Sequence, residues 1–121
     1  MTTSGTIGKI DRTKWQKAHN DSVWVQFAFE GLSADDIRPG VFAYPPCWAA
    51  CDPGMTLEAH EHAIPEMYFY VAGEGRMRVG EEWFDVAKGM AVNIPPNATH
   101  EVECATSSAG PVIWMSIGLS E

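Results

Sequence analysis

Long hydrophobic runs are missing from this chain of 121 residues, and its N-terminus lacks the apolar stretch of a secretory signal peptide. A membrane-spanning helix needs about 20 consecutive apolar residues, and a signal peptide needs an apolar segment of its own. We therefore expect a cytoplasmic protein with no membrane partner. Cysteine is scarce as well. Cys47, Cys51 and Cys104 contain no C-x-x-C spacing, and we expect buried, reduced thiols.

Positive charge is the second shortage. The formal net charge is −8 and the sequence pI is near 4.8. A surface of this charge repels phosphate backbones, which argues against a nucleic-acid partner. No Lys or Arg occurs between Pro39 and Gly75, so any site built from this segment lacks a cationic side chain.

The sequence does contain the composition of one globular domain, with 45% hydrophobic and 20% charged residues. Its length suits one domain and is too short for two. We predict a single domain over residues 1–121, in which residues 1–21 form a polar arm that adds an edge strand or packs on a partner. The 11 glycines and 8 prolines are scattered, as is typical of short strands joined by turns.

Alternating apolar and polar positions predict strands. In the first of them Val23, Val25, Phe27 and Phe29 share one face. Short strands separated by Gly, Pro and Asn, with no long amphipathic helix, favour an all-β antiparallel sandwich or barrel. The expected strands cover residues 22–30, 41–51 (broken at Pro45-Pro46), 57–62, 66–71, 76–79, 83–86, 90–94, 100–104 and 112–117.

Two histidines separated by one residue, His60 and His62, are the strongest local feature. On a strand they point to the same face, where both imidazoles can reach one ion at about 2.0–2.2 Å. Glu66 opens the next expected strand, so a tight hairpin would bring its carboxylate beside them, and His100 can add a fourth ligand. Taken alone, the pair is equally compatible with two unrelated surface histidines. His19 lies outside the group, and we interpret it as an ordinary core or surface side chain.

Two longer spacings favour the metal site. They are Gly54-x5-His60-x-His62-x3-Glu66-x6-Gly73 and Gly89-x5-Pro95-x-Asn97-x2-His100-x3-Cys104. The first resembles one signature of the cupin superfamily at every specified position. The second resembles the other signature with two departures, because the family usually has Gly at Asn97 and Asn at Cys104. Asn tolerates the left-handed backbone that Gly would supply, and the Cys104 position is not a ligand in the family.

The resemblance covers residues 40–117 and implies a double-stranded β-helix, a jelly-roll-like barrel with one divalent metal near one mouth. It implies that the ligands are His60, His62, Glu66 and His100. Fe, Mn, Ni and Zn all accept such ligands, so the identity of the metal stays open. Small cupins of this kind often pair. We expect a homodimer, because the arm and the Pro45-Pro46 edge leave strand edges to be covered.

Alternation from the ligands also outlines a substrate cavity. Tyr68 follows Glu66 by two residues on the same strand face, so its phenol should lie near the metal, where it can donate a hydrogen bond or act as acid or base. The other candidate pocket residues are Phe42, Tyr44, Trp48, Tyr70, Val102, Cys104 and Trp114.

The cavity should contain no cationic side chain. Arg76 and Arg78 alternate with Met77 and Val79, and we expect the apolar pair to face inward. A dianion such as oxalate would then be neutralised by the metal alone. A small neutral, aromatic or zwitterionic molecule fits aromatic walls better.

Three classes of function remain open. The first is an Fe(II) dioxygenase, because three histidines and one glutamate leave open metal positions for substrate and O₂. The second is a non-redox lyase, dehydratase, isomerase or cyclase with the metal as Lewis acid and Tyr68 moving a proton. The run His60-x-His62-x3-Glu66-x-Tyr68-x4-Gly73 also resembles that of cupin dimethylsulfoniopropionate lyases, although many other cupins share it. The third is a module that binds a small ligand without chemistry, as some cupins that keep the motif bind only sugars or small effectors.

Overall fold

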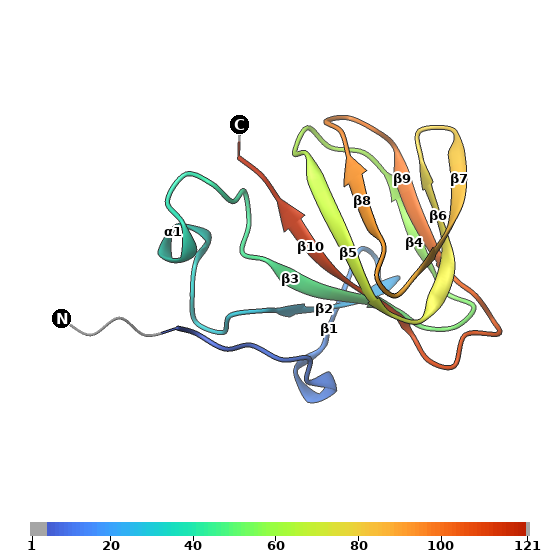
Figure 1. Cartoon of the computed structure of the whole chain (residues 1–121), viewed down its shortest axis with the longest axis horizontal. Coiled ribbons are helices and arrows are strands. Elements are labelled where there is room, and N and C mark those ends of the chain that lie inside the picture. Colours follow the sequence, from blue (N-terminus) through green and yellow to red (C-terminus); the bar gives the residue numbers. More distant parts are fainter. Residues whose placement is uncertain (1–4, 121) are drawn as a thin grey trace.

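Two antiparallel sheets make up the protein, which the computed structural model describes over residues 5–120 (Figure 1). One sheet has six strands in the order β1-β2-β3-β10-β5-β8, and the other has four in the order β4-β9-β6-β7. This arrangement confirms the predicted all-β class. The strands are β1 (Gln16–Ala18), β2 (Val23–Phe27), β3 (Cys47–Cys51), β4 (Thr56–His60), β5 (Glu66–Ala72), β6 (Glu74–Val79), β7 (Glu82–Ala87), β8 (Ala91–Ile94), β9 (His100–Cys104) and β10 (Val112–Gly118).

Helical structure within residues 5–120 is limited to two short segments, the 3-10 turn η1 (Arg12–Lys14) and the single turn α1 (Ala34–Ile37). A capping box at Ser33 and Asp36 closes the start of α1. None of the described helices is long and apolar enough to span a membrane.

Side chains from both sheets meet in one hydrophobic core. Trp114 and Tyr70 come from the six-stranded sheet, and Leu57, Met77 and Val102 come from the four-stranded sheet, all at most 2% exposed. The Tyr70 hydroxyl donates a hydrogen bond to the Met77 sulfur at 3.1 Å, which links the two sheets. Burying a large apolar side chain stabilises the fold by about 1.5–3 kcal/mol. These residues therefore hold the two sheets together.

The strand that carries His60 is shorter than the sequence predicted. We expected residues 57–62, but β4 ends at His60, and His62 lies in the connection that follows. That connection is not the expected tight hairpin, because β4 and β5 belong to different sheets. The chain leaves one sheet at His60 and enters the other at Glu66, with Pro65 between them. The ligand candidates therefore span the junction of the two sheets.

The N-terminal arm forms the predicted edge strand, since β1 pairs antiparallel with β2. The Gln26 side chain holds the rest of the arm by hydrogen bonds with the Lys9 carbonyl and the Asp11 amide. Residues 1–4 of the expected arm lie outside the described part of the chain. The alternation predicted for the first strand is only partly right: Val23 is in the core, but Phe27, the last residue of β2, is 60% exposed.

One glycine of the first signature has a clear steric reason. Gly73, between β5 and β6, has φ +77°, a backbone conformation that side chains disfavour. A Cβ added there would lie 2.4 Å from the Pro111 carbonyl oxygen. The close approach of the chain before β10 therefore requires glycine at this position.

Candidate metal centre

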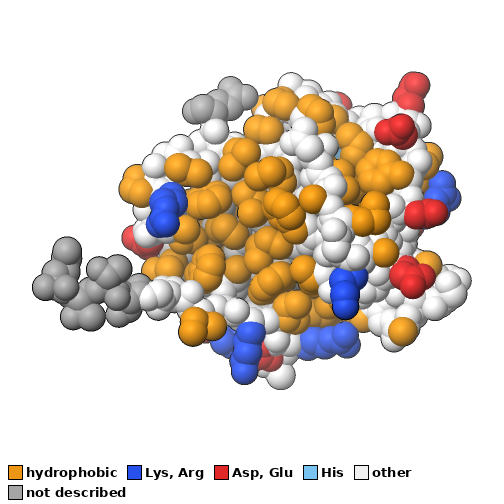
Figure 2. All heavy atoms as spheres, viewed as in Figure 1, with side chains coloured by type: hydrophobic (Ala, Val, Ile, Leu, Met, Phe, Trp, Pro, Cys, Tyr) orange, Lys and Arg blue, Asp and Glu red, His pale blue; other side chains and the backbone are white. Residues whose placement is uncertain are grey.

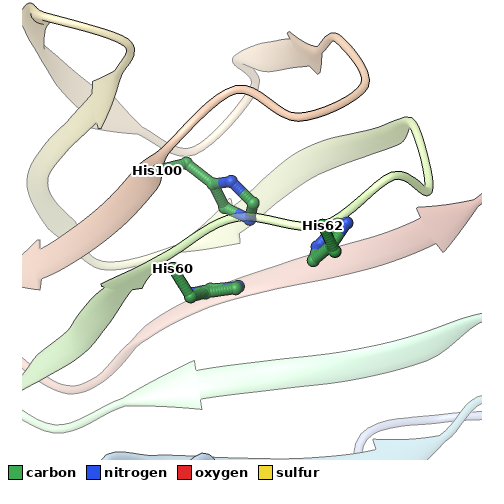
Figure 3. Close-up of side chains that lie close together, drawn as sticks. All are labelled: His60, His62 and His100. Atoms are coloured by element: carbon green, nitrogen blue, oxygen red, sulfur yellow. The ribbon is translucent and has the colours of Figure 1, made fainter.

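Three imidazoles point toward one another at one end of the barrel (Figure 3). His60 comes from the end of β4, His100 from the start of β9, and His62 from the connection into β5. Their ligand atoms all lie within 4.8 Å of one another. Donor atoms on one ion with bonds of about 2.1 Å lie at most about 4.2 Å apart, so little adjustment would let all three bind the same metal.

Each of these imidazoles has its ring orientation fixed in the same way. The Nδ1 atoms of His60, His62 and His100 lie 2.8 Å from the carbonyl oxygens of Glu58, Ile64 and Ala98, respectively. A carbonyl only accepts hydrogen bonds, so each Nδ1 carries the proton and donates. The Nε2 atom then presents its lone pair to the centre of the group. Such backbone partners are typical of histidines that bind metals.

Glu66 brings a carboxylate to the same point from the other sheet. Its Oε1 atom lies 2.9 Å from Nε2 of His62 and 3.3 Å from Nε2 of His100. Its Oε2 atom accepts a hydrogen bond of 2.6 Å from the Tyr44 hydroxyl. The phenol has only one hydrogen, so the Ser116 hydroxyl donates to the Tyr44 oxygen, also at 2.6 Å. One oxygen of Glu66 is thus held by the protein, and the other faces the histidines.

The electrostatics favour the protonation states that a metal requires. Burial alone would raise the pKa of Glu66, but side-chain hydrogen bonding, in which the Tyr44 hydroxyl donates to the carboxylate, outweighs it and lowers that pKa below its usual value. Burial lowers the pKa of His60. A metal ligand must be an ionised carboxylate or a neutral imidazole. Both residues are therefore in the ligand state near neutral pH.

Two buried acceptor atoms show that the site fits a cation. Glu66 Oε1 and His100 Nε2 are both inaccessible to solvent and have no hydrogen-bond partner of good geometry among the described residues. With the proton on Nδ1, both atoms are acceptors that face each other without a hydrogen between them. Unpaired buried polar atoms are costly. A divalent cation bound between them would satisfy both, so this group of residues fits a metal.

The aromatic wall beneath the ligands is formed by Tyr68 and Trp114. The Tyr68 ring stacks on Trp114 with centroids 5.2 Å apart and meets His100 edge-on at 6.2 Å. Tyr68 is 3% exposed, and burial raises the pKa of its hydroxyl well above the ordinary value. Val102 follows on β9 and is buried in the core beneath. The structure places Tyr68, Trp114 and Val102 beside or below the ligands, as the sequence predicted.

Other expected pocket residues lie elsewhere. Tyr70 is deeper in the core, where its hydroxyl is bonded to Met77. Cys104 pairs with Gly75 at the far end of β9 and lines a separate open cavity of about 670 Å³. Trp48 alternates with the core residue Ala49, so it faces the outside of the sheet. Phe42 bridges to Leu119 beside the C-terminal strand. The aromatic pattern alone did not separate these positions.

Sequence reasoning missed two residues at the site. The ring of His19 lies 5.0 Å from that of His60, and desolvation is the main cause that lowers the His19 pKa. Cys47 stands opposite Ser116 in register, and burial together with the charge of Glu66 raises the pKa of its thiol to about 12. The Asn20-Asp21 pair signalled a turn after His19, but no local signal shows where a hairpin tip packs.

A cleft of about 540 Å³ opens between the N-terminal arm and β2. Its apolar wall includes Val25, Phe27 and Ala28, and Cys47 lines it as well. Cys47 also stands opposite Ser116, but none of the four candidate ligands lines the cleft. It is large enough for a small organic molecule.

Comparisons with known proteins identify the family. A family model described as a cupin domain matches residues 48–118, and the chain therefore belongs to the cupin family. An uncharacterised protein of Streptomyces coelicolor is 30% identical over 93 residues, which cover 77% of this chain and 78% of that protein. The family expected from the sequence motifs is confirmed. The description of this relative gives no activity.

Solved structures share the fold. A Cupin 2 conserved barrel domain protein from Salinispora arenicola matches with a TM-score of 0.72 and 16% identity, covering 96% of this chain and 89% of that chain. A protein of Thermotoga maritima described as a predicted oxalate decarboxylase matches with a TM-score of 0.69 and 16% identity, covering 82% and 81%. These likenesses confirm the expected jelly-roll-like barrel and show the fold alone.

The hydrogen bond from Tyr44 to Glu66 yields a prediction about affinity. Tyr44→Phe keeps the ring but removes the hydroxyl that holds Oε2, so the carboxylate loses its orientation. We expect the dissociation constant of the bound metal to rise by about 10- to 100-fold, as measured by competition with a chromophoric chelator. Tyr70→Phe is the matched control, because its hydroxyl bonds Met77 in the core. It should leave metal affinity unchanged. Equal effects of the two substitutions would contradict the assigned role of Tyr44.

Proposed function

We propose that the protein is a metal-dependent enzyme that acts on a small neutral, aromatic or zwitterionic organic molecule, with Fe(II) dioxygenation as the first candidate reaction. The observation that carries the proposal is the convergence of three imidazoles and the Glu66 carboxylate on one point. A donor set of this kind leaves positions on a six-coordinate ion for both substrate and O₂. A purely structural site would use every position.

The chain's own residues suit such a reaction. When bound, a divalent ion supplies Lewis acidity and, if it is Fe(II), electrons for O₂ chemistry. His60, His62 and His100 hold their rings in place through backbone carbonyls. The Tyr68 hydroxyl has no hydrogen-bond partner among residues 5–120, so it is available to donate a hydrogen bond that orients the substrate. Trp114 and Tyr68 exclude water from the inner side of the site.

The charge distribution favours a substrate that is not a dianion. Arg78 forms an ion pair with Glu101, and Arg76 lies over the Trp83 ring at 4.5 Å. Both arginines alternate with Met77, which is buried in the core, so they face away from the barrel interior that holds the candidate ligands. The Thermotoga maritima protein described as a predicted oxalate decarboxylase shares only the fold. We therefore do not transfer its substrate.

A second candidate is a non-redox reaction, which the position of the Tyr68 phenol beside His100 favours. In this alternative the protein is a lyase, dehydratase, isomerase or cyclase, and Tyr68 is the group that gives or takes a proton. The two candidates use the same ligands and differ in their need for O₂.

We also propose a homodimer formed through the outer face of the six-stranded sheet. Figure 2, in the view of Figure 1, shows hydrophobic side chains gathered over the area where β3 and β10 run. On the outer face, Trp48 pairs with Met115, and Met115 pairs with Phe69, which is 38% exposed. Adjacent apolar side chains on one sheet face suit contact with a second copy.

The metal proposal predicts binding of one divalent ion per chain. Elemental analysis after loading should find it in the unaltered protein and not in His60→Ala or His62→Ala, because each change removes a donor. Loading at about 100 times the dissociation constant should raise the Tm by roughly 10 °C. A folded preparation that no first-row metal loads would sink the proposal.

The Tyr68→Phe substitution distinguishes proton transfer by the phenol from orientation of the substrate. The ring and its stacking on Trp114 are kept, so stability should change little. If the hydroxyl transfers a proton, turnover should fall by about 10²–10⁴-fold; if it only orients substrate, the loss should be smaller and O₂ uptake should match product. Activity and O₂ uptake are measured together on one candidate substrate. Unchanged activity would remove Tyr68 from the mechanism, and full turnover without O₂ would eliminate the dioxygenase.

The dimer proposal predicts that Phe69→Glu weakens association, because a charge would be buried at the interface. Light scattering at high micromolar concentration should give twice the chain mass for the unaltered protein and a lower mass for the variant. A clean monomer before substitution would refute the dimer.

A further inference from the structure

All four histidines of the chain lie at the metal centre, although only three of them converge as ligands. The ring of His19 is 5.0 Å from that of His60, and the two planes are inclined by 33°. This separation lies between the 4.2 Å and 5.6 Å that separate the His60 ring from the rings of His100 and His62. His19 is not part of the group whose ligand atoms lie within 4.8 Å of one another. It borders the site without belonging to the donor set.

The hairpin of β1 and β2 brings His19 to this position. Ala18 pairs with Val23 at the end of the hairpin, so residues 19–22 form its turn. The His19 carbonyl accepts hydrogen bonds from both the backbone and the side chain of Ser22, and the Lys17 ammonium donates to the Asp21 carbonyl. The turn is thereby fixed, and with it the direction in which His19 leaves the backbone.

The same turn carries backbone strain. His19, Asn20 and Asp21 have φ values of 50°, 56° and 64°. Non-glycine residues rarely adopt this left-handed conformation, and almost never in succession. Strain of this kind persists where the surrounding structure imposes it, and it is concentrated at functional sites. Glycine would remove this strain. We would therefore expect glycine in a turn that served only to connect two strands.

The His19 imidazole is free to bind a ligand. It makes no hydrogen bond to any residue in the described range 5–120, and its side chain is exposed at the mouth of the site. Apart from the Tyr68 hydroxyl and the indole Nε1 of Trp114, the walls next to the ligands offer few unpaired polar groups, because Tyr44 and Ser116 are already bonded to Glu66 and to each other. An imidazole beside the open side of the centre adds the polar contact that this side otherwise lacks.

We propose that His19 makes a hydrogen bond to the molecule held at the metal and so selects ligands that carry a carboxylate, carbonyl or similar acceptor next to the metal-binding group. The inference rests on the proposed metal site and adds a determinant of specificity to it. His19 is assigned to substrate contact and not to metal binding. A zwitterion that binds the metal through one group and carries a carboxylate next to that group would meet both requirements.

The test uses the full chain loaded with Co²⁺, whose absorption spectrum reports ligands, and azide as a small anionic probe. His19→Ala should bind Co²⁺ in a 1:1 ratio with a dissociation constant within about threefold of the unaltered protein. Its azide dissociation constant should rise by about tenfold, the effect of one lost hydrogen bond. His19→Gln keeps a polar group of similar reach and should recover most of the azide affinity. Asn20→Gly, in the same turn, suits the φ of 56° at this position and should leave both constants unchanged.

The outcomes are distinct. An azide constant unchanged in His19→Ala would overturn the proposed contact, and loss of Co²⁺ from that variant would overturn it too, because His19 would then be a ligand. Equal weakening in Asn20→Gly would assign the effect to the turn and not to the imidazole. If the unaltered protein binds no Co²⁺, the proposed metal function fails first. If it binds Co²⁺ and azide but shows no turnover on any substrate, the His19 contact still stands. Circular dichroism and Tm identify any variant that has not folded. If His19→Ala does not fold, the azide affinity of His19→Gln tests the contact.

Discussion

The placement of the Glu66 carboxylate is the constraint on which the site depends. Glu66 is 7% exposed, and a buried charge is costly unless it is paired and hydrogen-bonded. Tyr44 supplies the hydrogen bond to one oxygen, while the other oxygen faces His62 and His100. The fold therefore holds a negative charge against two imidazole lone pairs, an arrangement that a divalent cation completes.

The two-sheet architecture makes this arrangement possible. His60 and His100 are cross-strand neighbours in the four-stranded sheet, whereas Glu66 begins a strand of the six-stranded sheet. Packing of the sheets on the Trp114–Met77 core brings their ends together. The energy that holds the ligands in place thus comes from apolar burial below the site. At the mouth, the β1–β2 turn brings a fourth histidine beside His60.

Much of this was accessible from the sequence, for identifiable reasons. Periodicity predicted β9 at its observed bounds, His100–Cys104, and turn chemistry explained Asn97, which has φ 64°. The convergence of the histidines followed from motif spacing and resemblance. What the sequence could not reveal depends on contacts distant along the chain. The Tyr44 bond to Glu66 spans 22 residues, and the contact of His19 with His60 depends on which strand the arm joins. Strand alternation also could not tell that Trp48 faces outward, because both faces of β3 are apolar.

The most direct test of this account is a crystal structure of the metal-loaded protein, with anomalous scattering at the absorption edge of the bound element. The account predicts one anomalous peak about 2.0–2.3 Å from Nε2 of His60, His62 and His100. It also predicts that Glu66 binds through Oε1 alone, with Oε2 still bonded to Tyr44. A peak elsewhere, or an ion at this point that Glu66 does not bind, would contradict the central claim.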